Sequence, residues 1–291
     1  MTRSGLLYGI SAYALWGLFP LFFKQLQHVA SLEVVLHRMV WSLVFVLLVL
    51  GALRRWSWLR EAVRNPRLLA TFAASSTLLA ANWLTYIWAV NNGHVLDASL
   101  GYFILPLVNV ALGFVFLHER PRPGQWLAFG IAAAGVLWLA LLTGHVPWIA
   151  LGLALTFGIY GLIRKLAPLG ALEGMSLETM LLAPLAAVAL LWGHQSGGMP
   201  AHDAHTWLLF VLCGPVTAIP LLLFSAGARR VPLSTMGILQ YLTPTILLFL
   251  GTLLYDEPFA GPRLAGFALI WTALLLYSVD GWRHRTRPAV A

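Results

Sequence analysis

Ten long apolar segments account for most of this 291-residue chain. Each is close to the length of about 20 mostly apolar residues that a helix needs to cross a lipid bilayer. The apolar runs are continuous and do not alternate with polar residues, so they predict helices and not the strands of a barrel. The expected membrane-spanning segments are residues 5–24, 33–53, 68–90, 97–117, 124–142, 146–163, 176–192, 207–226, 235–254 and 263–281.

The composition excludes the soluble alternatives. Only 10% of the residues are charged and 60% are hydrophobic, whereas an ordinary soluble protein carries roughly 25% charged residues. A soluble fold of this length would lack the charge to cover its surface, and a disordered chain would be far less apolar. The single cysteine, Cys213, rules out an internal disulfide. We therefore expect an all-α polytopic membrane protein with ten transmembrane helices.

The basic residues predict the topology, because Lys and Arg are retained on the cytoplasmic side of a membrane. With the N-terminus inside, 15 of the 18 Lys and Arg residues lie in inner segments, while Lys24 and Arg263 lie outside and Arg38 lies within the second span. This bias predicts cytoplasmic N- and C-termini. It also assigns the net charge of +8 to loops that face anionic membrane lipids. No basic-aromatic surface pattern is present, so we expect no nucleic-acid partner.

Two pairs of segments indicate an internal duplication. Trp16–Lys24 matches Phe157–Lys165 in an aromatic-Gly-aliphatic-aromatic pattern that ends in Lys. Pro106–Glu119 matches Pro244–Glu257, with the same spacing from proline to glutamate. The offset is 141 residues in the first comparison and 138 in the second, so both fit one repeat length. The alternative is a chance likeness between apolar helices.

The repeat predicts two five-helix units, at residues 1–143 and 144–291. Because five is odd, the second unit enters the membrane from the opposite side. Inverted-topology repeats are typical of secondary transporters, whose substrate site lies near the membrane midplane between the halves.

Several motifs resemble the RarD-type branch of the EamA-like drug/metabolite transporter superfamily, in the expected order from about residue 5 to residue 281. The resemblance implies ten helices, two EamA repeats and a transporter of the bacterial inner membrane. The branch is associated with a chloramphenicol-sensitivity label. Leu105, where a polar Asn is expected, and the turn 255–258 depart from the family pattern. The matching motifs are Glu33–Ser42, Asn82–Asn92, Asp97–Phe103, Phe157–Lys165, Glu178–Thr179 and Leu233–Tyr241.

Arg38 is the leading candidate for a substrate contact, because an ionisable group inside a membrane segment is expensive and is a functional candidate by default. Its guanidinium suits an anionic or carboxylate-bearing substrate. The alternatives are a structural pair with Asp97 or Glu33, or an anchor that reaches the interface. His37 shares a helix face with Glu33, and is a candidate for carrying a coupling proton or for an ordinary hydrogen bond.

Glu178 is the counterpart of Arg38 under the repeat and the second candidate for proton coupling. The alternatives are a first-turn Glu favoured by the helix dipole, or a partner of Arg229 or Arg164. Glu119 and Glu257 precede turns and are interpreted as structural.

Aromatic and amide side chains inside the spans predict an apolar cavity with a few polar points, which suits a small amphipathic organic molecule. Ordinary helix packing is the alternative for each of them. The expected substrate-binding residues, besides Arg38, are Trp16, Phe19, Asn82, Trp83, Tyr86, Tyr102, Asn109, Tyr160, Gln240 and Tyr241.

Other chemistry is sparse. His194, His202, Asp203 and His205 cluster in one outer loop, but the loop is Gly-rich and short of supporting structure, so we expect no metal site. No phosphate-binding loop or hydrolase motif is present, so we expect neither a cofactor nor an enzyme.

The predicted function is a secondary transporter that exports small organic metabolites or drugs by alternating access, with proton coupling left open. The alternatives are a lipid-handling membrane protein and a channel. Small residues such as Gly130 and Gly135 leave a homodimer contact open as well.

Overall fold

The computed structural model describes residues 2–92, 94–142, 144–254 and 261–285, and these residues form helices joined by short connections. Ten helical segments among them are long and apolar enough to cross a membrane, which confirms the predicted ten-span fold. The elements are α1 (Arg3–Gly17), α2 (Phe19–Phe23), the 3-10 helix η1 (Lys24–Leu26), α3 (Ser31–Leu53), α4 (Ser57–Arg64), α5 (Pro66–Asn91), α6 (Val95–Leu117), α7 (Pro123–Leu141), α8 (Trp148–Leu166), α9 (Ala171–Gln195), α10 (Ala204–Ala228), α11 (Leu233–Gln240), α12 (Leu242–Leu254) and α13 (Pro262–Arg285).

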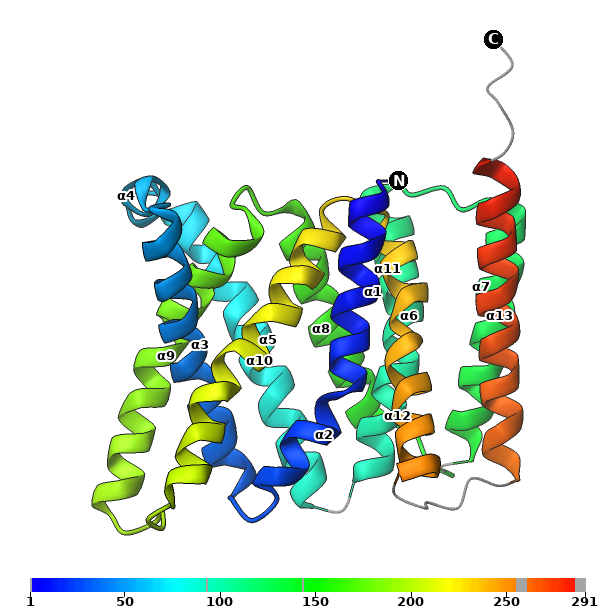
Figure 1. The fold of residues 1–291 in the computed structure, drawn as a ribbon. Helices are drawn as coiled ribbons and strands as arrows, with labels where there is room; N and C mark the ends of the chain where they lie inside the picture. The colour runs from blue at the N-terminus through cyan, green and yellow to red at the C-terminus, as the bar shows by residue number, and fades with distance from the viewer. Residues whose placement is uncertain (1, 93, 143, 255–260, 286–291) are drawn as a thin grey trace.

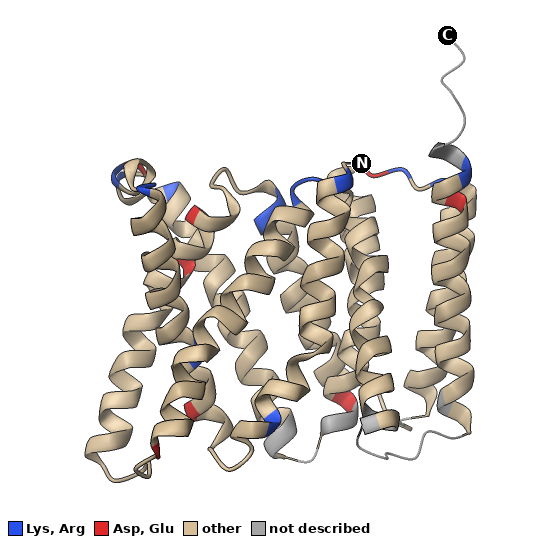
Figure 2. Cartoon of the chain, in the orientation of Figure 1, with Lys and Arg blue, Asp and Glu red and all other residues tan. Residues whose placement is uncertain are grey.

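The spans alternate in direction, and α1 starts at the same end of the bundle where α13 finishes (Figure 1). Lys and Arg gather at this end, which we call the basic end (Figure 2). The opposite end is called the far end below. α1 leaves the basic end, whereas α8, the first span of the second half, runs towards it. The two five-helix repeats are therefore inverted.

Two spans are interrupted rather than continuous. The first breaks at Leu18, and Pro20 follows in the first turn of α2. The ninth breaks at Tyr241, between α11 and α12, close to Pro244. Proline lacks the N–H that would continue the helical hydrogen-bond pattern, so it favours such interruptions. Pro106, by contrast, lies inside the uninterrupted α6.

The short helix α4 at the basic end is absent from the sequence prediction, which treated residues 54–67 as a basic loop. Its Arg60 and Arg64 are exposed, while Ala62 is buried and Trp58 packs against the neighbouring apolar cluster. A short helix with one apolar and one basic face suits the membrane interface.

The two repeats are interleaved and do not form separate cores. The most extensive helix contacts join elements of different halves, namely α6 with α8, α7 with α13, α3 with α9 and α10, and α1 with α10. One extensive buried cluster includes Tyr13 from the first half and Tyr160, Phe224 and Met236 from the second. Close packing between α7 and α13 uses Gly135, where an added Cβ would lie 2.9 Å from the carbonyl oxygen of Gly266.

Glu119 connects the halves at the basic end. It follows α6, and its carboxylate accepts hydrogen bonds from the backbone N–H groups of Leu233 and Ser234, at 2.6 and 3.0 Å. The Ser234 hydroxyl donates a third, at 2.6 Å. These donors belong to the first turn of α11, where a carboxylate satisfies unpaired N–H groups and the helix dipole. The structural interpretation of Glu119 therefore agrees with its contacts, whereas Glu257 lies outside the described residues.

Candidate functional site

Arg38 lies on α3, towards the far end of the membrane-spanning region. Its Nε donates a hydrogen bond to the Thr217 hydroxyl on α10, at 3.0 Å. The guanidinium carbon lies 5.0 Å from the ring centres of Phe23 and Trp83 and 5.9 Å from that of Phe19. The cation is thus enclosed by aromatic faces, to which a guanidinium is attracted.

No carboxylate pairs with Arg38 among the described residues. Of the two partners considered from the sequence, Glu33 instead contacts His202, at 2.9 Å between Oε1 and Nε2. Asp97 lies 3.4 Å from His94 and 3.7 Å from His145. Arg38 is half-buried as a whole residue, and the planar fork of N–H donors in its guanidinium matches a carboxylate.

The aromatic residues predicted for the site divide into two groups. Phe19 and Trp83 contact Arg38 directly, and Tyr86 and Tyr102 form an edge-on pair with ring centres 6.3 Å apart on the neighbouring helices α5 and α6. Phe23 also contacts Arg38 but was not singled out from the sequence. In the sequence, Phe23 was noted only as part of the repeated segment Trp16–Lys24.

Other predicted residues lie in helix contacts. Trp16 packs among Tyr13, Phe157 and Phe224. Asn82 on α5 donates to the Leu153 carbonyl and the Thr156 hydroxyl on α8, at 2.8 and 2.9 Å.

Three further candidates are buried where the halves meet. The Tyr241 hydroxyl donates to the Phe103 carbonyl, at 3.3 Å. Asn109 is buried with neither amide atom hydrogen-bonded, and the side-chain oxygen of Gln240 likewise has no partner. Unpaired buried amides are unusual in a packed interior, so these two remain candidates for polar contacts.

Glu178 lies on α9, towards the basic end, and it pairs with Arg164. Both side chains are almost inaccessible, at 2% and 0% exposure, and Arg164 Nε lies 3.7 Å from Glu178 Oε1. Ser75 and Tyr160 donate hydroxyl hydrogen bonds to the carboxylate, at 2.5 and 3.5 Å. Arg164 also donates to the Ser225 hydroxyl, at 3.1 Å. Four helices, α5, α8, α9 and α10, therefore converge on one buried ion pair.

These contacts correct the predicted location of Arg164 and identify which arginine pairs with Glu178. The sequence prediction put Arg164 in an inner loop, but the residue is fully buried in the last turn of α8. The predicted span ended at residue 163, so the sequence named Arg164 as a possible partner of Glu178 but did not place it inside the helix. Arg164, rather than Arg229, is the partner of Glu178. Arg229 instead donates to the carbonyls of Ala167 and Leu169, and burial together with the nearby Arg164 lowers its pKa.

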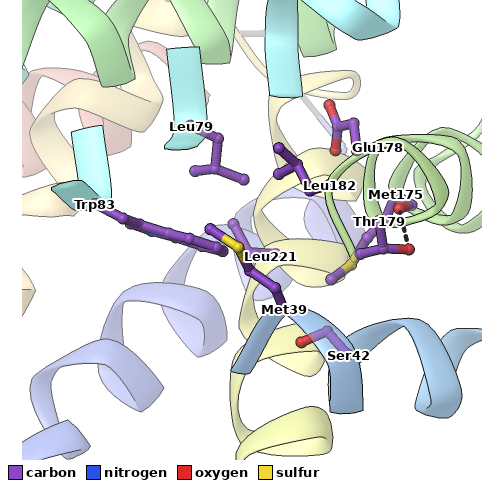
Figure 3. Close-up of a pocket in the computed structure, with 9 residues that line it drawn as sticks. All are labelled: Met39, Ser42, Leu79, Trp83, Met175, Glu178, Thr179, Leu182 and Leu221. Atoms are coloured by element: carbon purple, nitrogen blue, oxygen red, sulfur yellow. Dashed lines mark hydrogen bonds between the residues drawn. The ribbon is translucent and has the colours of Figure 1, made fainter. Parts of the chain in front are cut away.

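A small cavity lies between the two charged sites. It receives side chains from α3, α5, α9 and α10 (Figure 3). Trp83, which contacts Arg38, and Glu178 both line it. The space open to the centre of a water-sized sphere is about 10 Å³, which holds about one water molecule. The lining residues are Met39, Ser42, Leu79, Trp83, Met175, Glu178, Thr179, Leu182 and Leu221.

His37 faces away from Arg38 and packs at the far end. Its ring stacks on Phe210, with ring centres 3.8 Å apart, and meets Trp207 edge-on at 5.5 Å. Nε2 is buried and has no hydrogen-bond partner. The nearby loop is better supported than the sequence suggested, because His202 bonds Glu33 and the Asp203 side chain accepts from the backbone N–H of Thr206, at 2.9 Å.

Comparison with known proteins places this arrangement in a family context. The pattern of the EamA-like transporter family matches residues 3–141 and 146–279. An uncharacterized transporter of Pseudomonas aeruginosa is 48% identical, with the alignment covering 98% of this chain and 96% of the relative. Protein RarD of Streptomyces exfoliatus is 47% identical, covering 98% and 91%. Protein RarD of Escherichia coli is 42% identical, covering 96% and 95%.

A solved crystal structure shares the fold. It superposes with a TM-score of 0.74 over 98% of this chain and 100% of the other, at 19% sequence identity. The likeness extends over both halves of the chain, so the ten-helix arrangement is not peculiar to this sequence.

Proposed function

Because this chain belongs to the EamA-like family of membrane transporters, we propose that it exports small organic molecules carrying a carboxylate by alternating access. The family description and the name of the Pseudomonas aeruginosa relative indicate a transporter rather than an enzyme. The multi-pass fold supports a membrane location. We place it in the bacterial inner membrane, with the basic end and both termini in the cytoplasm.

The observation that carries the proposal is the unpaired Arg38 within its aromatic surroundings. A substrate carboxylate would accept hydrogen bonds from the guanidinium, and an apolar or aromatic body would lie against Phe19, Phe23 and Trp83. Tyr86 and Tyr102 pair with each other and lie close enough to interact with the charge of Arg38, and we assign them substrate-binding roles on that ground.

Alternating access requires that the two ends of the bundle open in turn. The complete burial of the Arg164–Glu178 pair supports a state that is closed at the basic end. Arg38 is half-buried and lies nearer the far end, so we infer that the substrate reaches it from that end in this state. Opening the basic end would separate the four helices that meet at the ion pair. The nearly filled cavity beside Trp83 would then expand to pass the substrate.

Glu178 is the residue that the contacts favour for proton coupling. Its carboxylate is held by Arg164, Ser75 and Tyr160 in the closed arrangement and would lose those partners when the helices part. A carboxylate that loses its cation takes up a proton more readily. Transport by Glu178→Gln is therefore expected to lose its response to a pH gradient.

The role of Arg38 in substrate binding is tested after the purified full-length protein is reconstituted into proteoliposomes. We would screen radiolabelled aromatic carboxylates together with their neutral amides, first by thermal stabilisation and then by uptake. Wild type is expected to bind and transport at least one carboxylate with saturation and trans-stimulation. It should neither bind nor transport the corresponding amide. Trans-stimulation separates a carrier from a channel.

The matched comparison is Arg38→Gln against Arg60→Gln, which removes an exposed arginine of α4. Arg38→Gln should abolish carboxylate selectivity while the protein still inserts and elutes as wild type. Arg60→Gln should transport normally. Equal stabilisation by carboxylates and amides in wild type, or full selectivity in Arg38→Gln, would refute the assigned role.

A further inference from the structure

Four side chains with metal-binding atoms gather at the far end. Glu33 and His37 lie one helical turn apart on α3, His194 lies in the last turn of α9, and His202 lies in the connection before α10. One ligand atom from each of Glu33, His37 and His194 lies within 4.8 Å of the other two. We propose that these three residues form a binding site for a divalent transition metal ion, of which Zn²⁺ is the representative.

The buried ring of His37 is the second observation that points to a ligand. Only 4% of the residue is exposed, and its Nε2 has no hydrogen-bond partner. Stacking on Phe210 and the edge contact with Trp207 hold the ring in one plane. Buried imidazole nitrogens are normally hydrogen-bonded. A coordinate bond satisfies such a nitrogen as a hydrogen bond does.

The ligand atoms of Glu33, His37 and His194 are close together but still farther apart than in a metal-bound site. Zinc bonds to histidine and carboxylate are about 2.0–2.2 Å, so the ligand atoms of a tetrahedral ion are about 3.4 Å apart. Two of the three ligands already share one turn of α3. His194 is exposed at a helix end, so its side chain can turn inwards to close the remaining gap.

His202 contacts the carboxylate of the same site without being one of the three proposed ligands. Its Nε2 lies 2.9 Å from Glu33 Oε1, and its ring meets Phe210 edge-on with ring centres 5.2 Å apart. A hydrogen bond to a ligating carboxylate fixes its orientation, and an apolar surround limits solvent access. Phe210 therefore contacts the rings of both His37 and His202.

The donor set selects the class of ion. Two imidazoles and a carboxylate suit Zn²⁺, Cu²⁺ and Ni²⁺, whereas Mg²⁺ and Ca²⁺ prefer oxygen ligands alone. The ion would join α3 of the first repeat to α9 of the second at their far ends. Binding itself does not depend on the proposed transport function and is measured without a substrate.

The test is Zn²⁺ titration by calorimetry on the full-length protein in detergent, after removal of any polyhistidine tag. Wild type is expected to bind one Zn²⁺ per chain saturably, undiminished by excess Mg²⁺. His194→Ala should weaken binding at least tenfold. It changes an exposed residue, so the folded protein remains available if Glu33→Gln or His37→Gln fails to fold.

His205→Ala is the matched control, because it removes an exposed histidine close to the same connection that is not part of the set. Its affinity should equal that of wild type. Co²⁺ substitution should give visible absorption bands that are lost in His194→Ala. The proposal is overturned by absence of saturable Zn²⁺ binding in wild type, by unchanged binding in His194→Ala, or by an equal loss in His205→Ala.

Discussion

The buried Arg164–Glu178 pair makes a quantitative prediction about stability. Removing one member of a fully buried ion pair leaves an uncompensated charge and typically costs about 3–5 kcal/mol. Glu178→Gln leaves the guanidinium of Arg164, whose Nη1 already lacks a hydrogen-bond partner, without its anion. Arg164→Met leaves a buried carboxylate with only the hydroxyls of Ser75 and Tyr160 as donors. Each single variant is therefore expected to lose about 3–5 kcal/mol.

The double variant removes both charges and should be far less affected than the sum of the two. The remaining loss comes from acceptors that Arg164 satisfied, chiefly the Ser225 hydroxyl and the Ala171 carbonyl. That loss amounts to about 1–3 kcal/mol. The double-mutant cycle should thus give a coupling free energy of at least about 3 kcal/mol.

The assay is thermal unfolding in mild detergent at one fixed scan rate, because such proteins often unfold irreversibly. At about 2 °C per kcal/mol, each single variant should lower Tm by at least about 6 °C. The partly exposed pair Arg55–Glu173, at 3.4 Å and with 60% and 15% exposure, is the control. Its variants should change stability by less than about 1 kcal/mol. Additive effects at the buried pair, or single variants as stable as wild type, would refute this reasoning.

Three further changes test the packing and the helix ends. Gly237→Ala places a Cβ 2.5 Å from a carbonyl oxygen of α6 and should destabilise by about 1–3 kcal/mol, whereas Gly130→Ala, with open space around it, should lower Tm little or not at all. Glu119→Ala should lower Tm and raise hydrogen exchange in the first turn of α11, because its three donors lose their acceptor; unchanged protection would contradict that role. Hydrogen bonds from the start of α10 lower the pKa of Asp203, so its ionised form stabilises the fold above its ordinary pKa, and this stabilisation is lost as pH falls through the lower, folded-state pKa. Asp203→Ala should therefore lower Tm at neutral pH and lose less stability than wild type below about pH 4, and parallel pH profiles would contradict it.

The spans were predictable because membrane crossing leaves a signal in every stretch of about 20 residues. The interruptions were harder to predict. Pro106 and Pro244 both lie mid-span, yet only the second lies near a break, since tertiary packing decides whether a helix containing proline stays continuous. The amphipathic helix α4 was not predicted, because its many charged residues made the segment resemble a loop.

The candidate site was predicted in its residue types but not in its pairings. Arg38 contacts Phe19 and Trp83, and all three were named from the sequence because intramembrane charge and aromatic residues are visible there. Their role in binding a substrate stays a prediction. The partner of Glu33 is distant in sequence, and the partner of Glu178 lies on a neighbouring helix. Because no local pattern identifies contacts between residues on different elements, Arg164 was named only as one of two possible partners of Glu178, and His202 was assigned to an unsupported loop.

The interleaving of the two repeats limits which parts of the protein can move as rigid bodies. A half of the chain has no interior of its own, since its helices find their main partners in the other half. The boundary between the two repeats in the sequence is therefore not a hinge between two rigid bodies in the structure. Any conformational change must move groups of helices that contain members of both repeats. A half expressed alone would need to pair with a second, oppositely oriented copy to bury its apolar faces.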